Sequence, residues 1–253
     1  MGLLHRLVST FLAVCAIIGL TDMAVMGKAE PIPARRCACV PILDPGHGGA
    51  DGGAVAPDGT EEADLNLAVA LRLEMVFRLF GIAPVMTRTT REIDYPAECR
   101  TIRQKKVYDQ KSRLALVSEV PGGVLISIHQ NIFSASSAHG AQVLYAPNGE
   151  SRALAEQLQA ALASGADRTG GKAAAPITRD IYLINSAPCP AVLAECGFLS
   201  NPGELSLLQD PDYQLRLAGS IFAGFLAWTR ISPDENGGTN ESQDDLLLYR
   251  MRQ

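Results

Sequence analysis

Short apolar runs alternate with amphipathic stretches along most of the chain, and this alternation predicts a sheet covered by helices. Nearly continuous apolar runs are typical of strands that are buried on both faces. Runs of this kind lie at residues 40–43, 83–87, 123–129, 140–146, 181–184 and 191–195. Apolar positions at helical spacing predict helices over residues 62–79, about 104–119, 151–163 and 211–230. Strands that alternate with helices indicate an α/β fold: a single-domain, twisted, mostly parallel or mixed sheet with helices on both faces.

The first 29 residues follow a different pattern, in which a basic start precedes one apolar run. Arg6 stands before the apolar stretch 7–20, and the small residues Gly27 and Ala29 suit a cleavage site before Glu30. This arrangement is typical of a secretory signal peptide, and the run is short for a membrane span. The alternative is a retained N-terminal anchor. We therefore expect an exported protein that acts outside the cytoplasm and meets a membrane only if this segment is retained.

Length, composition and net charge limit the fold and the binding partners of the chain after residue 29. The chain has 253 residues, of which 47% are hydrophobic, and this suits one globular domain with a full core. We assign residues 30–38 to a proline-bearing polar linker, 39–230 to the globular, catalytic domain and 231–253 to a flexible acidic tail. The formal net charge of −5 argues against a nucleic-acid partner, because proteins that bind nucleic acids are basic.

The cysteines that follow the predicted signal peptide are Cys37, Cys39, Cys99, Cys189 and Cys196. An odd number leaves at least one of them unpaired in an oxidising compartment. Their spacing does not match a zinc finger. We therefore expect them to be structural.

Polar residues with catalytic chemistry follow three of the predicted strands. His47 lies in a glycine-rich loop just after the first strand, His129 ends the third, and Glu195 ends the last. Because the carboxyl ends of parallel strands meet at one edge of a sheet, we expect these side chains to lie close together. The loop is not a dinucleotide-binding loop, since Asp51 occupies the position of the third glycine of that motif. The plainer alternative is a glycine-rich turn in which His47 is incidental.

Two histidines and a carboxylate are a common ligand set for catalytic zinc, with the fourth position left to water. Two carboxylates compete for the third place: Glu62, at the start of the helix 62–79, and Glu195. A hydrolase with one metal ion needs one acid on the metal and another that accepts a proton from water. The residues alone do not decide which acid has which role. The structural alternatives are a helix-dipole role for Glu62 and a core position for His129.

Three other polar residues have structural interpretations. His139 is expected to be a turn residue rather than a ligand. Arg88 lies just past the strand 83–87 and is assigned to the surface rather than to substrate contact. Asp44 either caps the turn after the first strand or orients His47, and the turn cap is favoured.

The region 40–228 resembles the zinc-dependent N-acetylmuramoyl-L-alanine amidases, the type 3 amidases, which cut the bacterial cell wall. Four motifs in order carry the resemblance: ILDPGHGG at 42–49, EADLNLA at 62–68, SIH at 127–129 and ECGFLSNP at 195–202. The resemblance implies one Zn²⁺ per chain, bound by His47, Glu62 and His129. It implies that Glu195 is the catalytic acid and base. The implied reaction is hydrolysis of the amide bond between the lactyl group of N-acetylmuramic acid and L-alanine, so the expected partner is a peptidoglycan glycan strand with its peptide stems.

Within this family the chain looks most like the members of the spore cortex and germination branch. Residues 101–109 and 180–183 carry this closer likeness. Members of that branch remove peptide stems from muramic acid, a step toward muramic-δ-lactam, so the resemblance implies a role in spore cortex maturation. Gln130, Asn131 and Cys196 depart from the family pattern in small ways. The sequence identifies no accessory protein.

Two other functions stand as alternatives. A zinc peptidase would cut within the peptidoglycan stem peptides, and a wall-binding protein would keep the fold without turnover. Loss of the site residues would mark the wall-binding protein. The chain retains all four: His47, Glu62, His129 and Glu195.

Overall fold

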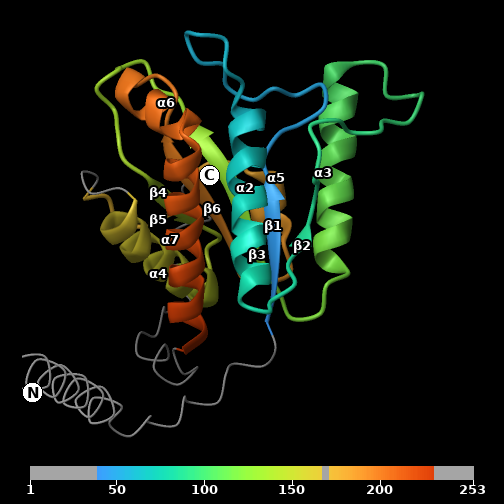
Figure 1. Ribbon diagram of the computed structural model, residues 1–253. Helices are drawn as coiled ribbons and strands as arrows, with labels where there is room; N and C mark the ends of the chain where they lie inside the picture. The colour runs from blue at the N-terminus through green and yellow to red at the C-terminus, as the bar shows by residue number, and fades with distance from the viewer. Residues whose placement is uncertain (1–38, 167–170, 231–253) are drawn as a thin grey trace, which may run out of the picture. The chain divides into compact units, whose positions relative to one another are not determined.

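The computed structural model describes residues 39–166 and 171–230, which form a six-stranded mixed sheet and its helices (Figure 1). The strands are β1 (Val40–Pro45), β2 (Val85–Met86), β3 (Gly123–Asn131), β4 (Gln142–Tyr145), β5 (Ala175–Pro176) and β6 (Ala191–Phe198). Their order in the sheet is β2-β1-β3-β6-β4-β5. β4 runs antiparallel to β6, and every other neighbouring pair is parallel. The predicted mixed α/β sheet is therefore confirmed.

Helices cover both faces of this sheet, which explains why the strands are apolar on both sides. Helices α2 (Glu62–Leu79), α4 (Gly149–Gly165) and α7 (Pro211–Arg230) pack on one face, and α6 (Pro202–Gln209) lies against α7. Helices α3 (Ile102–Ser118) and α5 (Tyr182–Ser186) pack on the other face (Figure 1). Successive strand residues alternate between the two core clusters. Leu43 and Ile126 belong to the first cluster, and Ile42 and Leu125 belong to the second.

One predicted element is wrong. The apolar run 181–184 predicts a strand, but Tyr182–Ser186 forms the short helix α5. A run of this length does not distinguish a strand from one turn of helix. Leu183 and Ile184 are buried in the second core cluster, on the face of the sheet rather than at its edge. A single helical turn buries both side chains there without strand pairing.

Side-chain caps decide where two helices begin. α3 begins at Ile102, slightly before the predicted start near 104, because Thr101 and Gln104 form a capping box. α6 is absent from the predicted elements. It begins where the Asn201 side chain accepts hydrogen bonds from two backbone N–H groups, with Pro202 at its first position.

The predicted signal peptide (1–29), linker (30–38) and acidic tail (231–253) lie outside the described residues. None of the helices described by the structure is both long enough and apolar enough to cross a membrane.

Candidate active site

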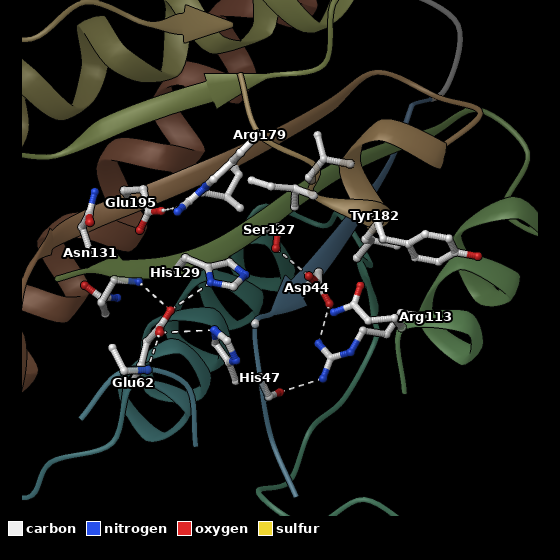
Figure 2. Close-up of a pocket in the computed structure, with 18 of the residues that line it drawn as sticks. Asp44, His47, Glu62, Arg113, Ser127, His129, Asn131, Arg179, Tyr182 and Glu195 are labelled. Atoms are coloured by element: carbon white, nitrogen blue, oxygen red, sulfur yellow. Dashed lines mark hydrogen bonds and ion pairs between the residues drawn. The ribbon is translucent and has the colours of Figure 1, made fainter. Parts of the chain in front are cut away.

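A pocket of about 490 Å³ opens at the carboxyl ends of β1, β3 and β6 (Figure 2). Four residues predicted for the site line it: His47, Glu62, His129 and Glu195. The facing wall comes from α3 and from the segment 179–184, which leads into α5. The carboxyl ends of the strands, together with the start of α2, thus gather these side chains around one space.

Glu62 joins the two histidines into one cluster. Its Oε2 lies 3.2 Å from His47 Nε2, and its Oε1 lies 2.9 Å from His129 Nδ1. One potential ligand atom from each residue lies within 4.8 Å of those of the other two. Two imidazole nitrogens and one carboxylate oxygen form the donor set of catalytic zinc sites, in which one coordination position stays open. The residues present therefore fit a metal ion.

Glu62 is held as a carboxylate by hydrogen-bond donors on every side. It is the first residue of α2 and is 4% exposed. Its Oε2 accepts a hydrogen bond from the backbone N–H of Ala54 at 2.9 Å. Its Oε1 accepts from the backbone N–H of Gln130 at 3.1 Å and from Asn66 Nδ2 at 3.3 Å. Burial acts to raise the pKa of Glu62, but the two histidines outweigh it and hold the pKa well below its usual range.

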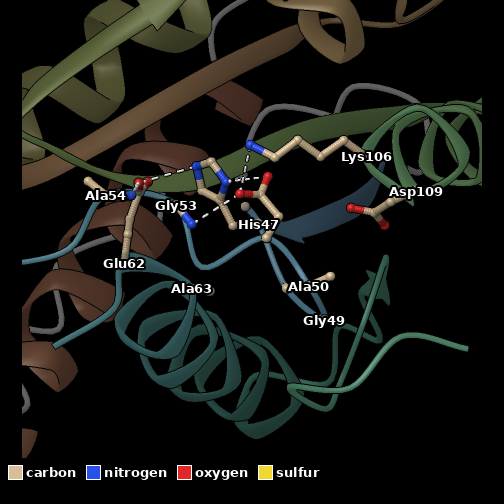
Figure 3. Close-up of polar contacts among 12 residues, drawn as sticks. His47, Gly49, Ala50, Gly53, Ala54, Glu62, Ala63, Lys106 and Asp109 are labelled. Atoms are coloured by element: carbon tan, nitrogen blue, oxygen red, sulfur yellow. Dashed lines mark hydrogen bonds and ion pairs between the residues drawn. The ribbon is translucent and has the colours of Figure 1, made fainter. Parts of the chain in front are cut away.

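Asp51 contacts the ring nitrogen of His47 that faces away from Glu62. His47 Nδ1 lies 3.0 Å from Asp51 Oδ2, and Asp51 Oδ1 lies 2.9 Å from Lys106 Nζ of α3. Figure 3 shows the His47 ring with Glu62 on one side and Lys106 beyond the other. A carboxylate on one ring nitrogen orients the imidazole so that the other nitrogen faces Glu62. Asp51 is not among the residues predicted for the site. The signal that identifies it is a carboxylate four residues after a candidate histidine ligand.

The charge around His47 is strongly negative. Burial acts to lower the pKa of His47, but hydrogen bonds to Asp51 and Glu62 raise it to about 9. Without a metal ion, a proton satisfies this demand for positive charge. The same surplus of carboxylate charge is what a divalent cation would balance.

Two glycines keep the space that the cluster occupies. At Gly53, whose φ is 73°, a Cβ atom would lie 2.6 Å from Glu62 Oε2 and 2.7 Å from His47 Cδ2. At Gly46 a Cβ atom would lie 2.2 Å from His129 Nε2. His47 itself has a φ of 60°, in the left-handed region that costs a residue with a Cβ atom about 1–2 kcal/mol. The loop therefore depends on glycine for its close approach to Glu62 and His129.

Asp44 is the centre of a buried network, and its predicted role as a turn cap is wrong. Its carboxylate accepts hydrogen bonds from Thr87 Oγ1 (2.6 Å), Ser127 Oγ (2.5 Å) and Arg113 Nη1 (2.6 Å). Arg113 also donates from Nη2 to the carbonyl oxygen of His47 at 2.7 Å (Figure 2). Asp44 thus acts on the His47 backbone through Arg113 and does not touch the imidazole. Arg113 was not predicted for the site, because its partner lies far away in the sequence.

Asp44→Asn is expected to lower the free energy of unfolding by about 2 kcal/mol near neutral pH, because the buried Arg113 charge loses one of its two carboxylate partners and keeps only Asp109. Burial acts to raise the pKa of Asp44, but Arg113, Ser127 and Thr87 outweigh it and lower the pKa from 3.8 to about 2. Because the folded pKa is below the unfolded value, this carboxylate stabilises the protein fully above pH 3.8. The contribution is lost as the pH falls through about 2. Urea unfolding across this range should show the difference between wild type and variant shrinking toward the acid end.

The matched control for this measurement is an exposed pair on α2. Glu74→Gln breaks the ion pair between Glu74 and Arg78, whose atoms lie 2.9 Å apart, and should cost less than about 1 kcal/mol. Equal losses from the two variants would contradict a special role for the Asp44 network.

Arg88 is buried, so its predicted surface position is wrong. It is 8% exposed, and its Nε donates to the carbonyl oxygen of Pro45 at 2.9 Å. Its Nη2 donates to the carbonyl oxygens of Gly46 (2.9 Å) and Ala63 (2.8 Å). Arg88 therefore ties the loop after β1 to the first turn of α2.

Neither His139 nor any cysteine of the described residues lines the pocket. His139 is exposed and its Nδ1 lies 2.9 Å from the carbonyl oxygen of Ser137, in agreement with the predicted turn. Free thiols are present at Cys99, Cys189 and Cys196. Cys37 lies outside the described residues.

Glu195 stands apart from the ligand cluster, on β6 and in register with His129 of β3. It is 4% exposed, and its Oε1 lies 3.4 Å from Arg179 Nη2 (Figure 2). Its Oε2 is buried and has no hydrogen-bond partner among the residues described. Burial raises the pKa of this carboxyl above its usual value, although His129 and Arg179 act in the opposite direction. A carboxyl with these properties in a pocket can accept a proton and return it. Arg179, like Asp51, was not predicted for the site.

Comparison with known proteins identifies relatives of the whole described domain. Residues 42–227 match the family described as N-acetylmuramoyl-L-alanine amidase. A germination-specific N-acetylmuramoyl-L-alanine amidase of Bacillus subtilis (strain 168) is 35% identical over 187 residues, which are 74% of this chain and 78% of the relative. The resemblance predicted from the four motifs, including its germination branch, is therefore confirmed.

Two solved structures are similar to the present one. The CwlD amidase of Clostridioides difficile, solved in complex with the GerS lipoprotein, has a TM-score of 0.72 and 36% identity over 75% of this chain and 98% of that chain. The catalytic domain of CwlV, an N-acetylmuramoyl-L-alanine amidase of Bacillus (Paenibacillus) polymyxa var. colistinus, has a TM-score of 0.65 and 27% identity. The match covers 77% of this chain and 99% of CwlV.

Proposed function

The chain belongs to the N-acetylmuramoyl-L-alanine amidase family, and from this premise we propose a zinc-dependent hydrolysis in which four pocket residues have defined roles. The bond cleaved joins the lactyl group of N-acetylmuramic acid to L-alanine in bacterial peptidoglycan. One observation carries the proposal. A buried carboxylate, Glu195, lines the same pocket as the cluster of His47, Glu62 and His129.

The three clustered residues are assigned to the metal. When bound, zinc polarises the amide carbonyl and lowers the pKa of a water molecule toward about 7. Asp51 orients His47 through its second ring nitrogen, and the donors around Glu62 keep that carboxylate ionised. The protein therefore presents the ligands in a fixed arrangement before substrate enters.

Glu195 is assigned to the proton transfers. Its unpartnered Oε2 accepts a proton from the attacking water and then returns it to the nitrogen of the departing L-alanine. Without this proton, the nitrogen would have to leave as an amide anion, which is a very poor leaving group. The return of the proton is therefore essential to bond cleavage. Arg179 lies 3.4 Å from the other carboxylate oxygen and acts to lower the pKa of Glu195, against the effect of burial.

We further propose that the substrate is spore cortex peptidoglycan outside the cytoplasm. The germination-specific relative and the segments 101–109 and 180–183 support this assignment. Removal of a stem leaves a free lactyl carboxyl on muramic acid, which is the group that a muramic-δ-lactam requires. The predicted signal peptide agrees with export.

Metal analysis combined with product identification tests this function. We expect about one zinc ion per chain, loss of activity after treatment with 1,10-phenanthroline, and recovery when zinc is returned. The digest should contain peptides that begin with intact L-alanine, and glycans with free lactyl carboxyl groups. Cleavage within the stem would indicate the peptidase, and binding without products would indicate the wall-binding protein. Equal rates on cortex and vegetative wall would contradict the cortex assignment.

A further inference from the structure

A second groove adjoins the active-site pocket where α3 and α5 meet. It encloses about 300 Å³ and is lined by Lys106, Val107, Gln110, Lys111 and Tyr182. Gln110 and Tyr182 line the pocket as well, so the two spaces lie next to each other. Neither the metal contacts nor the proton transfers proposed above use Val107, Lys111 or Tyr182. The groove is therefore available to a part of the substrate away from the cleaved bond.

The groove combines an apolar floor with a cationic rim. Val107 is 48% exposed and Tyr182 is 42% exposed, so both offer apolar surface to a ligand. Lys111 is exposed and makes no ion pair within the part of the chain that the structure describes. Lys106 lines the groove with its side chain while its ammonium group binds Asp51. No carboxylate is among the lining residues, so the rim attracts anions.

One half of the peptidoglycan substrate matches these properties. Next to the cleaved bond, the glycan strand carries hydroxyl and acetamido groups without charge. The stem peptide begins with the methyl group of L-alanine and continues with residues that bear free carboxylates. We propose that this groove binds the stem peptide, with a stem carboxylate paired to Lys111 and apolar stem atoms on Val107 and Tyr182. The inference rests on the proposed function and adds to it the part of the substrate that α3 recognises.

One short segment of the chain, 179–182, connects the surroundings of Glu195 with this groove. Glu195 is assigned to the nitrogen of L-alanine, which is the first atom of the stem, and it lines the pocket that the groove adjoins. The first residue of the segment 179–182 contacts Glu195, since Arg179 Nη2 lies 3.4 Å from Glu195 Oε1. The last residue of the segment, Tyr182, lines the groove. Figure 2 shows Tyr182 turned away from the ligand cluster and toward α3. The same short segment therefore leads from the leaving nitrogen to the lysine rim.

Two matched muropeptides test this inference on the intact protein. Both carry one disaccharide; the first bears L-alanyl-D-glutamate, and the second bears the same dipeptide with both glutamate carboxylates converted to amides. Lys111→Glu should lower the ratio of kcat/KM for the charged compound to kcat/KM for the amide about tenfold, because like charges replace an attractive pair. A general loss of folding or metal lowers both values and leaves their ratio unchanged.

Arg103→Glu is the charge-matched control, because it makes the same charge reversal on α3 outside the groove lining. This control should keep the wild-type ratio, and Lys111→Arg should retain it as well. An unchanged ratio in Lys111→Glu, or an equal fall in Arg103→Glu, overturns the stem-binding assignment while the amidase function stands. If the wild type cleaves neither compound, the proposed function fails and the groove assignment fails with it.

Discussion

Glu195→Gln is expected to lower kcat on purified peptidoglycan by about three orders of magnitude while the variant keeps its zinc. Glutamine has nearly the same shape as glutamate but cannot accept and return a proton. Positioned acid–base groups contribute about 10²–10⁴-fold to catalysis, and Glu195 is assigned to two successive transfers. Steady-state kinetics and metal analysis on one preparation measure both quantities.

A merely structural role for Glu195 predicts a lower melting temperature for Glu195→Gln, whereas the proton-transfer role does not. The side chain is 4% exposed and one of its oxygens has no partner among the described residues, so a neutral amide removes a buried charge. The melting temperature of Glu195→Gln should therefore equal or exceed that of the wild type. A variant that retains more than about a tenth of the wild-type kcat would remove Glu195 from the proton-transfer role. Loss of zinc would instead place this carboxylate on the metal.

His129→Ala should lose both zinc and activity. Its Nδ1 lies 2.9 Å from Glu62 Oε1, and it supplies one of the three potential ligand atoms that the structure brings together. Changes to the partners of metal ligands alone reduce metal affinity about 10–100-fold. Loss of a ligand itself should therefore weaken zinc binding by more than about 100-fold. Competition with a chelator of known affinity measures this change directly.

The chain supplies a matched control in His139→Ala. This histidine is exposed, contacts the carbonyl oxygen of Ser137 and does not line the pocket. The control should keep stoichiometric zinc and the wild-type rate. Stoichiometric zinc in His129→Ala would exclude His129 as a ligand and favour its alternative role as a core histidine.

The location of the site was predictable because residues with catalytic chemistry directly follow the predicted strands in the sequence. His47, His129 and Glu195 each follow an apolar run, and the structure places those runs side by side in parallel. The division of labour between the two carboxylates was not predictable from spacing. Only the fold shows that the start of α2 turns Glu62 against both imidazoles, while Glu195 faces Arg179.

The wrong predictions share a physical cause. The pattern of neighbouring residues in the sequence does not indicate which distant groups a side chain contacts in the fold. Arg88 follows a strand and resembles a surface residue until its four backbone acceptors are known. Asp44 resembles a turn cap until Arg113, in another helix, is found against it. The run 181–184 is apolar enough for a strand, and only its place on the face of the sheet makes it helical. Groups that bond to distant backbone or to buried ions are the ones that local pattern misses.

Arg88 and Arg113 both donate hydrogen bonds to backbone carbonyl oxygens at the end of β1 and in the loop that follows it. Arg88 donates to the carbonyl oxygens of Pro45 and Gly46, and Arg113 donates to those of Pro45 and His47. The carbonyl oxygens of three consecutive residues are thereby held by two buried guanidinium groups. Preorganisation of this kind reduces the conformational entropy that a ligand must remove on binding. Folding has therefore already ordered the backbone that carries His47, and a ligand bound at this cluster would not have to order it again.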